Sequence, residues 1–214
     1  LPGKAVALAG GQVTAADLDM NRTDDMPQFL TRQFEARGVP AGLVVMTYAA
    51  AGVKFDALTP EGFDRSNHGN LTATFMLARQ VGEAMGERGG GSVVLFSSMY
   101  GGVAPDPRMY EAPMEVNPVE YGVAKAGIRQ LARYLAVRWG PRSVRCNSIS
   151  PGPFPNPTIC ANEPAFVERL GRKVPLGRVG RAEEIGGAVA FLLADESSFV
   201  TGIDLAVDGG WAAW

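Results

Sequence analysis

Short apolar runs alternate along the chain with longer stretches in which apolar residues recur every three or four positions. Residues 41–52 and 92–98 are nearly continuous apolar runs, which is typical of strands buried on both faces of a parallel sheet. Residues 144–150 and 203–210 predict two further strands, and the apolar segment 4–9 predicts one at the start. The strands are therefore spread over the whole chain.

Helical periodicity fills the intervals between these strands. Met26, Phe29, Leu30 and Phe34 follow one another at helical spacing, after two acids at the amino end, where the helix dipole favours negative charge. A long polar and apolar stretch then ends in three glycines, a common helix stop. The helices that we expect span residues 22–38, 59–91, 117–139 and 183–193.

Strands that alternate with helices of this length predict an α/β fold with a doubly wound parallel sheet, similar to a Rossmann fold. In such folds ligands bind beyond the carboxyl ends of the strands. We expect one domain, residues 1–214, because this length suits a single core. The proline-rich segments 105–118 and 151–157 are the longest irregular pieces, and such loops often shape a pocket.

Composition and charge restrict the kind of partner. The net charge is −2, with 20 Lys and Arg against 22 Asp and Glu, which argues against nucleic acid or a membrane surface and favours a small-molecule substrate. No apolar run is long enough to span a bilayer, and the start does not read as a signal peptide. Two cysteines, Cys146 and Cys160, form no disulfide framework, so we expect a cytoplasmic protein. No set of residues has metal-ligand spacing, so no metal is expected.

The candidate chemistry begins with the segment YGVAK. It places Tyr121 and Lys125 four residues apart, on one face of the predicted helix, where an ammonium can lower the pKa of a phenol. Ser98 stands at the end of a predicted strand in SSMYG, and Asn70 lies in GNLTATF within a predicted helix. Each residue also has a plain structural reading, such as a solvated helix face for the Tyr and Lys pair.

These motifs, in this order, resemble the short-chain dehydrogenase/reductase family, and residues 175–211 are similar to the carboxy-terminal segment of that family almost from end to end. The resemblance implies a hydride transfer between NAD or NADP and a carbon that bears a hydroxyl or carbonyl group. It implies that Tyr121 is the general acid and base, that Lys125 lowers the phenol pKa and binds the ribose, that Ser98 orients the substrate oxygen, and that Asn70 supports the proton relay.

The resemblance also implies a set of cofactor contacts. In the family a proline and glycine loop contacts the nicotinamide amide, and an aspartate after the third strand contacts adenine. The residues at the corresponding positions are Gly10, Gly11, Asp17, Gly52, Pro151, Gly152 and Thr158.

The chain departs from the family at the first turn. The family pattern TGxxxGxG, on which the pyrophosphate rests, is reduced to Gly10 and Gly11. Residues 13–19 best match the third strand of the family, so about forty residues are absent between the first strand and the third, and the fold is truncated near its amino end. Three explanations stay open: the segment belongs to the protein but not to this sequence, the deletion weakens dinucleotide binding, or it marks a changed function.

Two smaller departures follow. Ala49 to Gly52 replace the usual Asn-Asn-Ala-Gly, which removes an asparagine amide that holds neighbouring backbone. Ser98 and Tyr121 stand 23 positions apart, where many members have about thirteen. The insertion is similar to that of members that act on sugars, and Arg108, Tyr110 and Glu111 are candidates to contact a polar substrate; a solvated loop is the alternative.

The leading hypothesis is an NAD(P)-dependent oxidoreductase acting on a hydroxyl or carbonyl substrate, with a sugar or polyol as one option. The first alternative is a redox-independent lyase, isomerase or dehalogenase that uses Ser98 and Tyr121 for proton transfer. The second is a non-catalytic family member. A homo-oligomer, either a dimer or a tetramer, is expected because the missing segment would leave apolar surface to be covered.

Overall fold

A computed structural model describes residues 14–213. Its centre is a sheet of four parallel strands in the order β1, β2, β3, β4. Val44 pairs with Val94, Val94 pairs with Asn147, and Ile149 pairs with Leu205. The strands are β1 (Gly42–Val45), β2 (Gly91–Phe96), β3 (Val144–Pro151) and β4 (Asp204–Val207).

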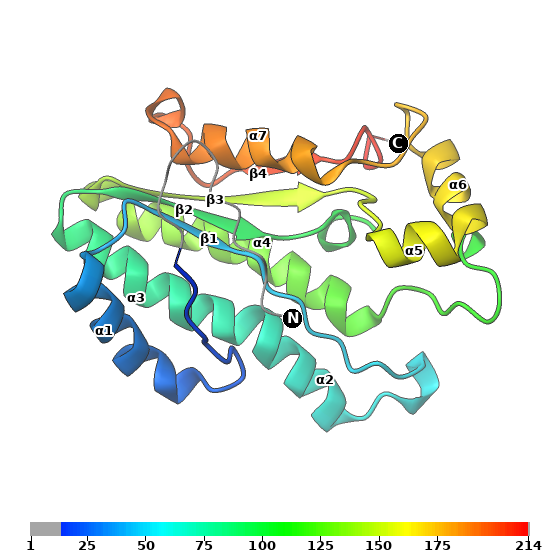
Figure 1. Cartoon of the computed structure of the whole chain (residues 1–214), viewed down its shortest axis with the longest axis horizontal. Helices are drawn as coiled ribbons and strands as arrows, with labels where there is room; N and C mark the ends of the chain where they lie inside the picture. The colour runs from blue at the N-terminus through cyan, green and yellow to red at the C-terminus, as the bar shows by residue number, and fades with distance from the viewer. Residues whose placement is uncertain (1–13, 214) are drawn as a thin grey trace.

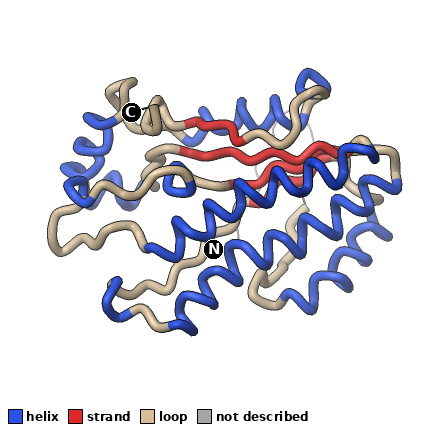
Figure 2. Tube along the Cα trace, turned by 180° about the vertical axis from the view of Figure 1, so that it is seen from behind, coloured by secondary structure: helices blue, strands red, loops and turns tan. Residues whose placement is uncertain are grey.

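Helices cover both faces of the sheet, as the doubly wound arrangement requires. In Figure 1 α7 lies above the strands, whereas α1, α3 and α4 lie below them. Figure 2 shows the same layers from behind, with α4 directly against the sheet. The α-helices are α1 (Met26–Arg37), α2 (Pro60–Asn67), α3 (Ala73–Glu87), α4 (Val119–Trp139), α5 (Pro157–Asn162), α6 (Pro164–Lys173) and α7 (Ala182–Leu193).

The apolar core follows the alternation of side chains along β2. Val93 and Leu95 pack with α3 and α4 in the larger cluster, whereas Val94 and Phe96 pack with Leu192 of α7 in the smaller one. Successive residues of a strand point to opposite faces, so one apolar strand serves both layers. This explains why residues 93–96 are apolar without interruption.

The structure differs from the sequence prediction in two segments that contact each other, the loop after β1 and the middle of the long helix. The expected strand 41–52 ends at Val45, and the expected helix 59–91 is interrupted by a π-helical turn at His68–Thr72 between α2 and α3. The side chain of Asn70, in this turn, hydrogen-bonds both the N–H and the C=O of Ala49. Side-chain partners therefore replace the sheet ladder beyond Val45.

The segment that we expected to match a third family strand is not a strand. Residues 14–19 form no ladder with β1 or any other described strand, and Asp17 is exposed. Most of this segment is Ala and Asp, which are depleted in strands. Gly10, Gly11 and the predicted strand 4–9 lie outside the described residues. Within residues 14–213 no helix is long and apolar enough to cross a bilayer.

Candidate active site

The four candidate catalytic residues come from three elements that meet at the carboxyl ends of β1 and β2. Ser98 follows β2, Asn70 lies in the π-helical turn, and Tyr121 and Lys125 lie in the first two turns of α4. The ammonium Nζ of Lys125 lies 5.5 Å from the centroid of the Tyr121 ring. The spacing of four residues therefore brings the amine beside the phenol, as expected.

Lys125 is buried, and its ammonium is held by backbone carbonyls. Nζ donates one hydrogen bond to the Thr47 carbonyl and one to the Phe96 carbonyl, each at 2.8 Å. Burial lowers the pKa of Lys125 to about 8, because a low-dielectric environment disfavours the charged form. An ammonium has three donors, so one remains after these two contacts.

The backbone after β1 is fixed by side chains from α2, the π-helical turn and α4. Asn70 Oδ1 accepts from the Ala49 amide at 3.0 Å, and Ser66 Oγ donates to the Ala49 carbonyl at 3.1 Å. The buried Glu120 carboxylate accepts from the Ala51 amide at 3.0 Å. Glu120 thus anchors backbone in the segment where the family asparagine is replaced by alanine.

The environment of Tyr121 is dominated by burial. Burial raises the pKa of Tyr121 above its ordinary value of 10.0, and the neighbouring Ser98 hydroxyl opposes this change. The lowering of the phenol pKa by Lys125 stays a prediction. The Tyr48 ring packs against Tyr121 with centroids 5.5 Å apart.

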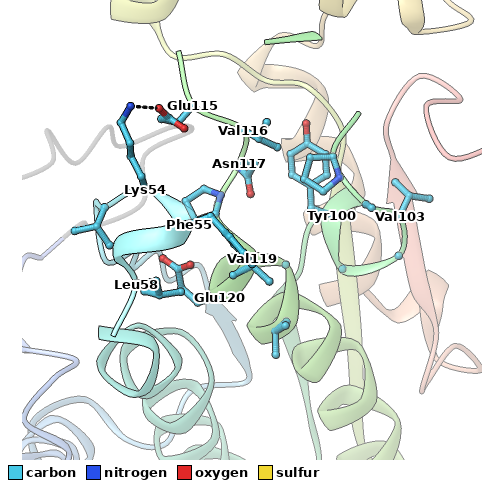
Figure 3. A pocket seen from close by; sticks show the side chains of 18 residues that line it. Lys54, Phe55, Leu58, Tyr100, Val103, Glu115, Val116, Asn117, Val119 and Glu120 are labelled. Carbon is cyan, nitrogen blue, oxygen red and sulfur yellow. Dashed lines mark ion pairs between the residues drawn. The ribbon is translucent and has the colours of Figure 1, made fainter. Parts of the chain in front are cut away.

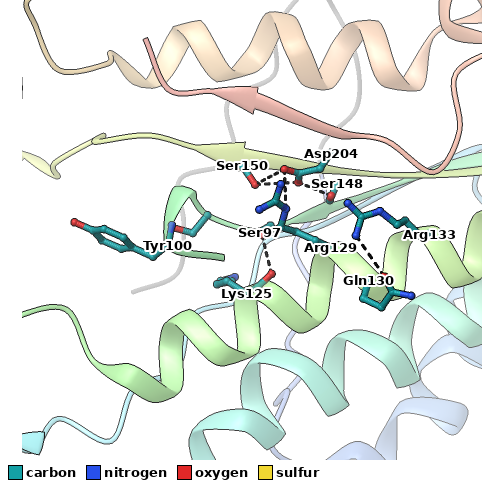
Figure 4. A network of polar contacts seen from close by, with 10 residues as sticks. Ser97, Tyr100, Lys125, Arg129, Gln130, Arg133, Ser148, Ser150 and Asp204 are labelled. Carbon is teal, nitrogen blue, oxygen red and sulfur yellow. Dashed lines mark hydrogen bonds and ion pairs between the residues drawn. The ribbon is translucent and has the colours of Figure 1, made fainter. Parts of the chain in front are cut away.

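Polar contacts beneath the site hold α4 against the sheet (Figure 4). Ser97 Oγ donates to the Lys125 carbonyl at 2.8 Å. One turn further along α4, Arg129 Nε lies 3.0 Å from Asp204 Oδ2 on β4. The same carboxylate accepts hydrogen bonds from Ser148 and Ser150 of β3. These contacts link the helix that carries Tyr121 to β3 and β4.

Ser98 and Tyr121 line one cavity of about 660 Å³. Its walls come from the segment between Ser98 and Tyr121 and from the segment between β3 and α6. Ser98 Oγ accepts from the Tyr100 amide at 3.2 Å, which fixes this side chain at the end of β2. A hydroxyl or carbonyl oxygen that enters the cavity can therefore meet both Ser98 and Tyr121.

A second cavity, of about 600 Å³, lies on the other side of Tyr100 and is lined by neither Ser98 nor Tyr121. Figure 3 shows the apolar side chains of Phe55, Leu58 and Val119 around it, with the ion pair of Lys54 and Glu115 at the edge. Ser98 and Tyr121 thus belong to the first cavity.

The predicted cofactor residues divide into three groups. Gly52 has φ +72°, a conformation that suits glycine, and it follows the loop held by Asn70. Pro151 ends β3, and a Cβ on Gly152 would lie 2.5 Å from the Asp208 Cα. Gly152 lines the first cavity, whereas Thr158 is exposed in α5. Gly10 and Gly11 lie outside the described residues, and Asp17 is exposed in a segment that forms no strand.

Of the three candidate substrate contacts in the insertion, one lines the cavity. The Tyr110 side chain does so, whereas Arg108 is exposed and pairs with Asp106, and Glu111 pairs with Arg169. Both charged groups therefore serve to hold the insertion rather than to face the cavity.

Sequence reasoning missed several residues of the site. Thr47 supplies a carbonyl to Lys125 and Tyr48 packs on Tyr121. Both lie inside the predicted strand 41–52, but β1 ends at Val45 and leaves them beyond its carboxyl end, where ligands are expected. Phe166, on α6, lines the cavity. The prolines that begin α5 and α6, Pro157 and Pro164, were a usable signal because proline is favoured in the first turn of a helix.

The chain is similar in sequence to a known protein family and to several dehydrogenases. The family model described as enoyl-(acyl carrier protein) reductase matches residues 4–212. The chain is 35% identical over 147 residues to galactitol 2-dehydrogenase (L-tagatose-forming) of Cereibacter sphaeroides, covering 68% of this chain and 55% of that protein. It is 35% identical over 145 residues to cis-4-hydroxycyclohexanecarboxylate dehydrogenase of Sinomonas cyclohexanicum, covering 67% and 54%. The chain thus spans about half the length of these relatives.

Among solved structures, a short-chain dehydrogenase from Leptospira borgpetersenii with bound NAD+ has a TM-score of 0.81 and 31% identity, covering 91% of this chain and 73% of that one. A short-chain dehydrogenase/reductase type protein from Mycobacterium marinum has a TM-score of 0.80 and 27% identity, covering 96% and 78%. The predicted fold class is confirmed by these structures and by the parallel sheet.

Proposed function

The chain belongs to the short-chain dehydrogenase/reductase family, and from this premise we propose that it is an NAD(P)-dependent oxidoreductase that interconverts a hydroxyl and a carbonyl group on a small molecule. The observation that carries the proposal is the convergence of Ser98 and Tyr121 on one cavity, with the Lys125 ammonium 5.5 Å from the Tyr121 ring. The dehydrogenase names of the relatives support it over the redox-independent alternative.

The residues at the nicotinamide end fit such a cofactor. Lys125 keeps one donor for a ribose hydroxyl, and the backbone at Gly52 and Gly152 lies at the carboxyl ends of β1 and β3. These residues, with Pro151, would hold the nicotinamide half. When bound, the nicotinamide accepts a hydride in oxidation and returns it in reduction. We extend this assignment to Thr158, Gly10, Gly11 and Asp17 by family resemblance alone.

The side chains of the protein would then transfer the proton and position the substrate oxygen. In oxidation Tyr121 Oη, as the phenolate, takes the proton of the substrate hydroxyl. The carbon that bears this hydroxyl gives up its hydrogen with the bonding electron pair, as a hydride, and the C=O bond forms. Ser98 Oγ hydrogen-bonds the substrate oxygen and holds it beside Tyr121. Lys125 stabilises the negative phenol oxygen from its fixed position. Asn70 acts as a positioning residue, because it holds the backbone of Ala49 near Lys125.

Titration of the purified chain with NADH and with NADPH, followed by calorimetry, tests the proposal. We expect saturable micromolar binding of one of them, and a large loss of affinity in the Lys125→Ala variant. The folded state of each protein is checked by circular dichroism. A folded wild-type chain that binds neither dinucleotide up to millimolar concentration would refute an NAD(P)-dependent reaction and return attention to redox-independent proton transfer at Ser98 and Tyr121.

A further inference from the structure

The wall of the catalytic cavity is largely apolar and aromatic. The insertion contributes Tyr110 and Met114, and the segment after β3 contributes Phe154, Ile159, Phe166 and Leu170. The cavity has a volume of about 660 Å³, which is in the range of small-molecule sites and leaves room for a compact ring-bearing substrate beside the nicotinamide end at Gly152. Such an apolar wall favours the binding of a substrate whose own surface is largely apolar.

Most polar groups in this wall already have partners, and the buried Asn117 Oδ1 is the exception among the described lining residues. Glu115 is the one charged residue of the lining within residues 14–213, and its carboxylate pairs with Lys54 at 2.7 Å. The hydroxyls of Tyr100 and Tyr110 hydrogen-bond each other at 2.8 Å. Asn156 Oδ1 accepts from the Ile159 amide at 2.9 Å and so caps α5.

This pattern disfavours an acyclic polyol. Ser98 and Tyr121 serve a single substrate oxygen. Asn117 Oδ1 is free to accept from one further hydroxyl, but the remaining hydroxyls of a polyol would face the apolar wall. Burying a polar group without a hydrogen bond is costly. A charged substrate meets the same difficulty, because the cavity has no free counter-charge among its described lining residues.

The apolar wall is fixed before any substrate binds. Arg169 of α6 donates to the Met109 carbonyl at 3.0 Å and pairs with Glu111 at 2.9 Å. The rings of Tyr110 and Phe166 pack with centroids 5.4 Å apart. The insertion and α6 thus form one continuous surface, and a rigid surface suits a rigid substrate, which loses little conformational freedom on binding.

We propose that the substrate is an uncharged secondary alcohol carried by an apolar alicyclic ring system, or the corresponding ketone, and that the wall formed by Tyr110, Met114 and Phe166 determines this specificity. The inference rests on the proposed oxidoreductase function. It names the substrate class that the cavity selects, and it assigns the insertion a role in choosing the substrate rather than in the chemistry.

The test compares 2-decalol with galactitol and mannitol as substrates, with NAD+ and with NADP+. We expect kcat/KM for 2-decalol to exceed that for either polyol by roughly 100-fold. Met114→Gln keeps nearly the same side-chain length but adds an amide, and should lower this ratio about tenfold while leaving NADH affinity unchanged. Phe166→Ala should act in the same direction through a raised KM. Phe191→Ala, on α7 at the other face of the sheet, is the matched control and should leave the ratio unchanged.

The outcomes separate this inference from the proposed function. A polyol oxidised as well as 2-decalol, or a ratio unchanged in both Met114→Gln and Phe166→Ala, overturns the inference and leaves the oxidoreductase standing. A chain that binds NADH but oxidises none of the three alcohols also overturns it. Failure to bind any dinucleotide is a failure of the proposed function itself.

Discussion

Tyr121 differs from phenylalanine by one hydroxyl, and that hydroxyl faces the cavity together with Ser98. Tyr121→Phe should therefore keep the fold and lower kcat by a factor of about 10² to 10⁴, the usual contribution of a positioned acid or base. NADH affinity, measured by calorimetry, should change little.

The matched control is Tyr134→Phe, which removes a hydroxyl from an exposed side chain of the same helix. It should retain wild-type kcat. A Tyr121→Phe variant with more than a tenth of the wild-type kcat would assign the proton transfer to another group.

Lys125 couples the site to the stability of the fold. Burial lowers its pKa from 10.5 to about 8, whereas the unfolded chain keeps the proton up to its ordinary pKa. Between these values the unfolded state binds more protons, so this residue makes stability rise with pH. Relative to Lys125→Met, we expect the wild type to gain about 2 to 3 kcal/mol of unfolding free energy between pH 7 and pH 10.

Urea unfolding of both proteins at pH 7, 8.5 and 10 measures this difference. Burial raises the pKa of Cys146 to about 12, which lowers stability at high pH, but this group is present in each protein and lies outside the catalytic site, so its effect cancels in the comparison. Parallel stability curves for the two proteins would show that Lys125 stays protonated across this range in the native state.

The sequence predicted the identity of these side chains better than their surroundings. The spacing of Tyr121 and Lys125 was enough to place them together, because a helix fixes residues four apart on one face. The two carbonyls that hold Lys125 come from Thr47, which follows β1, and from Phe96, which ends β2. Such long-range contacts leave no local pattern in a single sequence.

At the scale of elements, α3 and α4 pack closely through a glycine. A Cβ on Gly82 would lie 2.4 Å from the Trp139 ring, which is fully buried and donates from Nε1 to Glu83 at 3.0 Å. We expect Gly82→Ala to lower the free energy of unfolding by about 2 kcal/mol despite the better helix propensity of alanine. Chemical denaturation measures the change.

Gly187 provides the matched control, because it lies in α7 with no atom within 4 Å of an added Cβ. Gly187→Ala should raise the free energy of unfolding by about 0.5 to 1 kcal/mol. If both substitutions change the free energy of unfolding by the same amount, Trp139 can move aside without loss of stability. The contact between Gly82 and Trp139 then does not determine the distance between α3 and α4.

The predicted helices illustrate why periodicity succeeds for some elements and fails for others. The helices predicted at 117–139 and 183–193 are confirmed as α4 and α7 with small shifts at their starts. The π-helical turn at His68–Thr72 kept the apolar spacing of a continuous helix, so the sequence did not reveal it. A tertiary contact accompanies this turn, because the Asn70 side chain accepts a hydrogen bond from the Ala49 amide in the loop after β1.

At the scale of the whole molecule, the alternation of strands and helices predicts a parallel sheet, but the position of each cavity depends on which loops meet. The insertion before Tyr121 packs against α6, which follows it by more than forty residues in the chain, through Arg169 and Phe166. The sequence alone could not show that the insertion and α6 form one surface. Contact between this surface and the substrate stays a proposal.

The outer side of α4 supports the predicted homo-oligomer. Tyr134 and Val137 are well exposed on this helix, and Tyr134 borders a hollow of about 420 Å³ with Phe75 and Leu131. Exposed apolar side chains that gather on one surface mark a site of association, and a two-fold pairing would bring the same surface of two chains together. We therefore predict a dimer that pairs through α4.

Light scattering coupled to size-exclusion chromatography at micromolar concentration tests this arrangement. Tyr134→Glu should convert the dimer to a monomer, because the pairing would bury two carboxylates without partners. Phe191→Glu changes an exposed aromatic on the opposite face of the sheet and should leave the dimer intact. If the wild type is monomeric, or if Tyr134→Glu stays dimeric while Phe191→Glu dissociates, the α4 surface is not the interface, and the α7 side of the sheet becomes the better candidate.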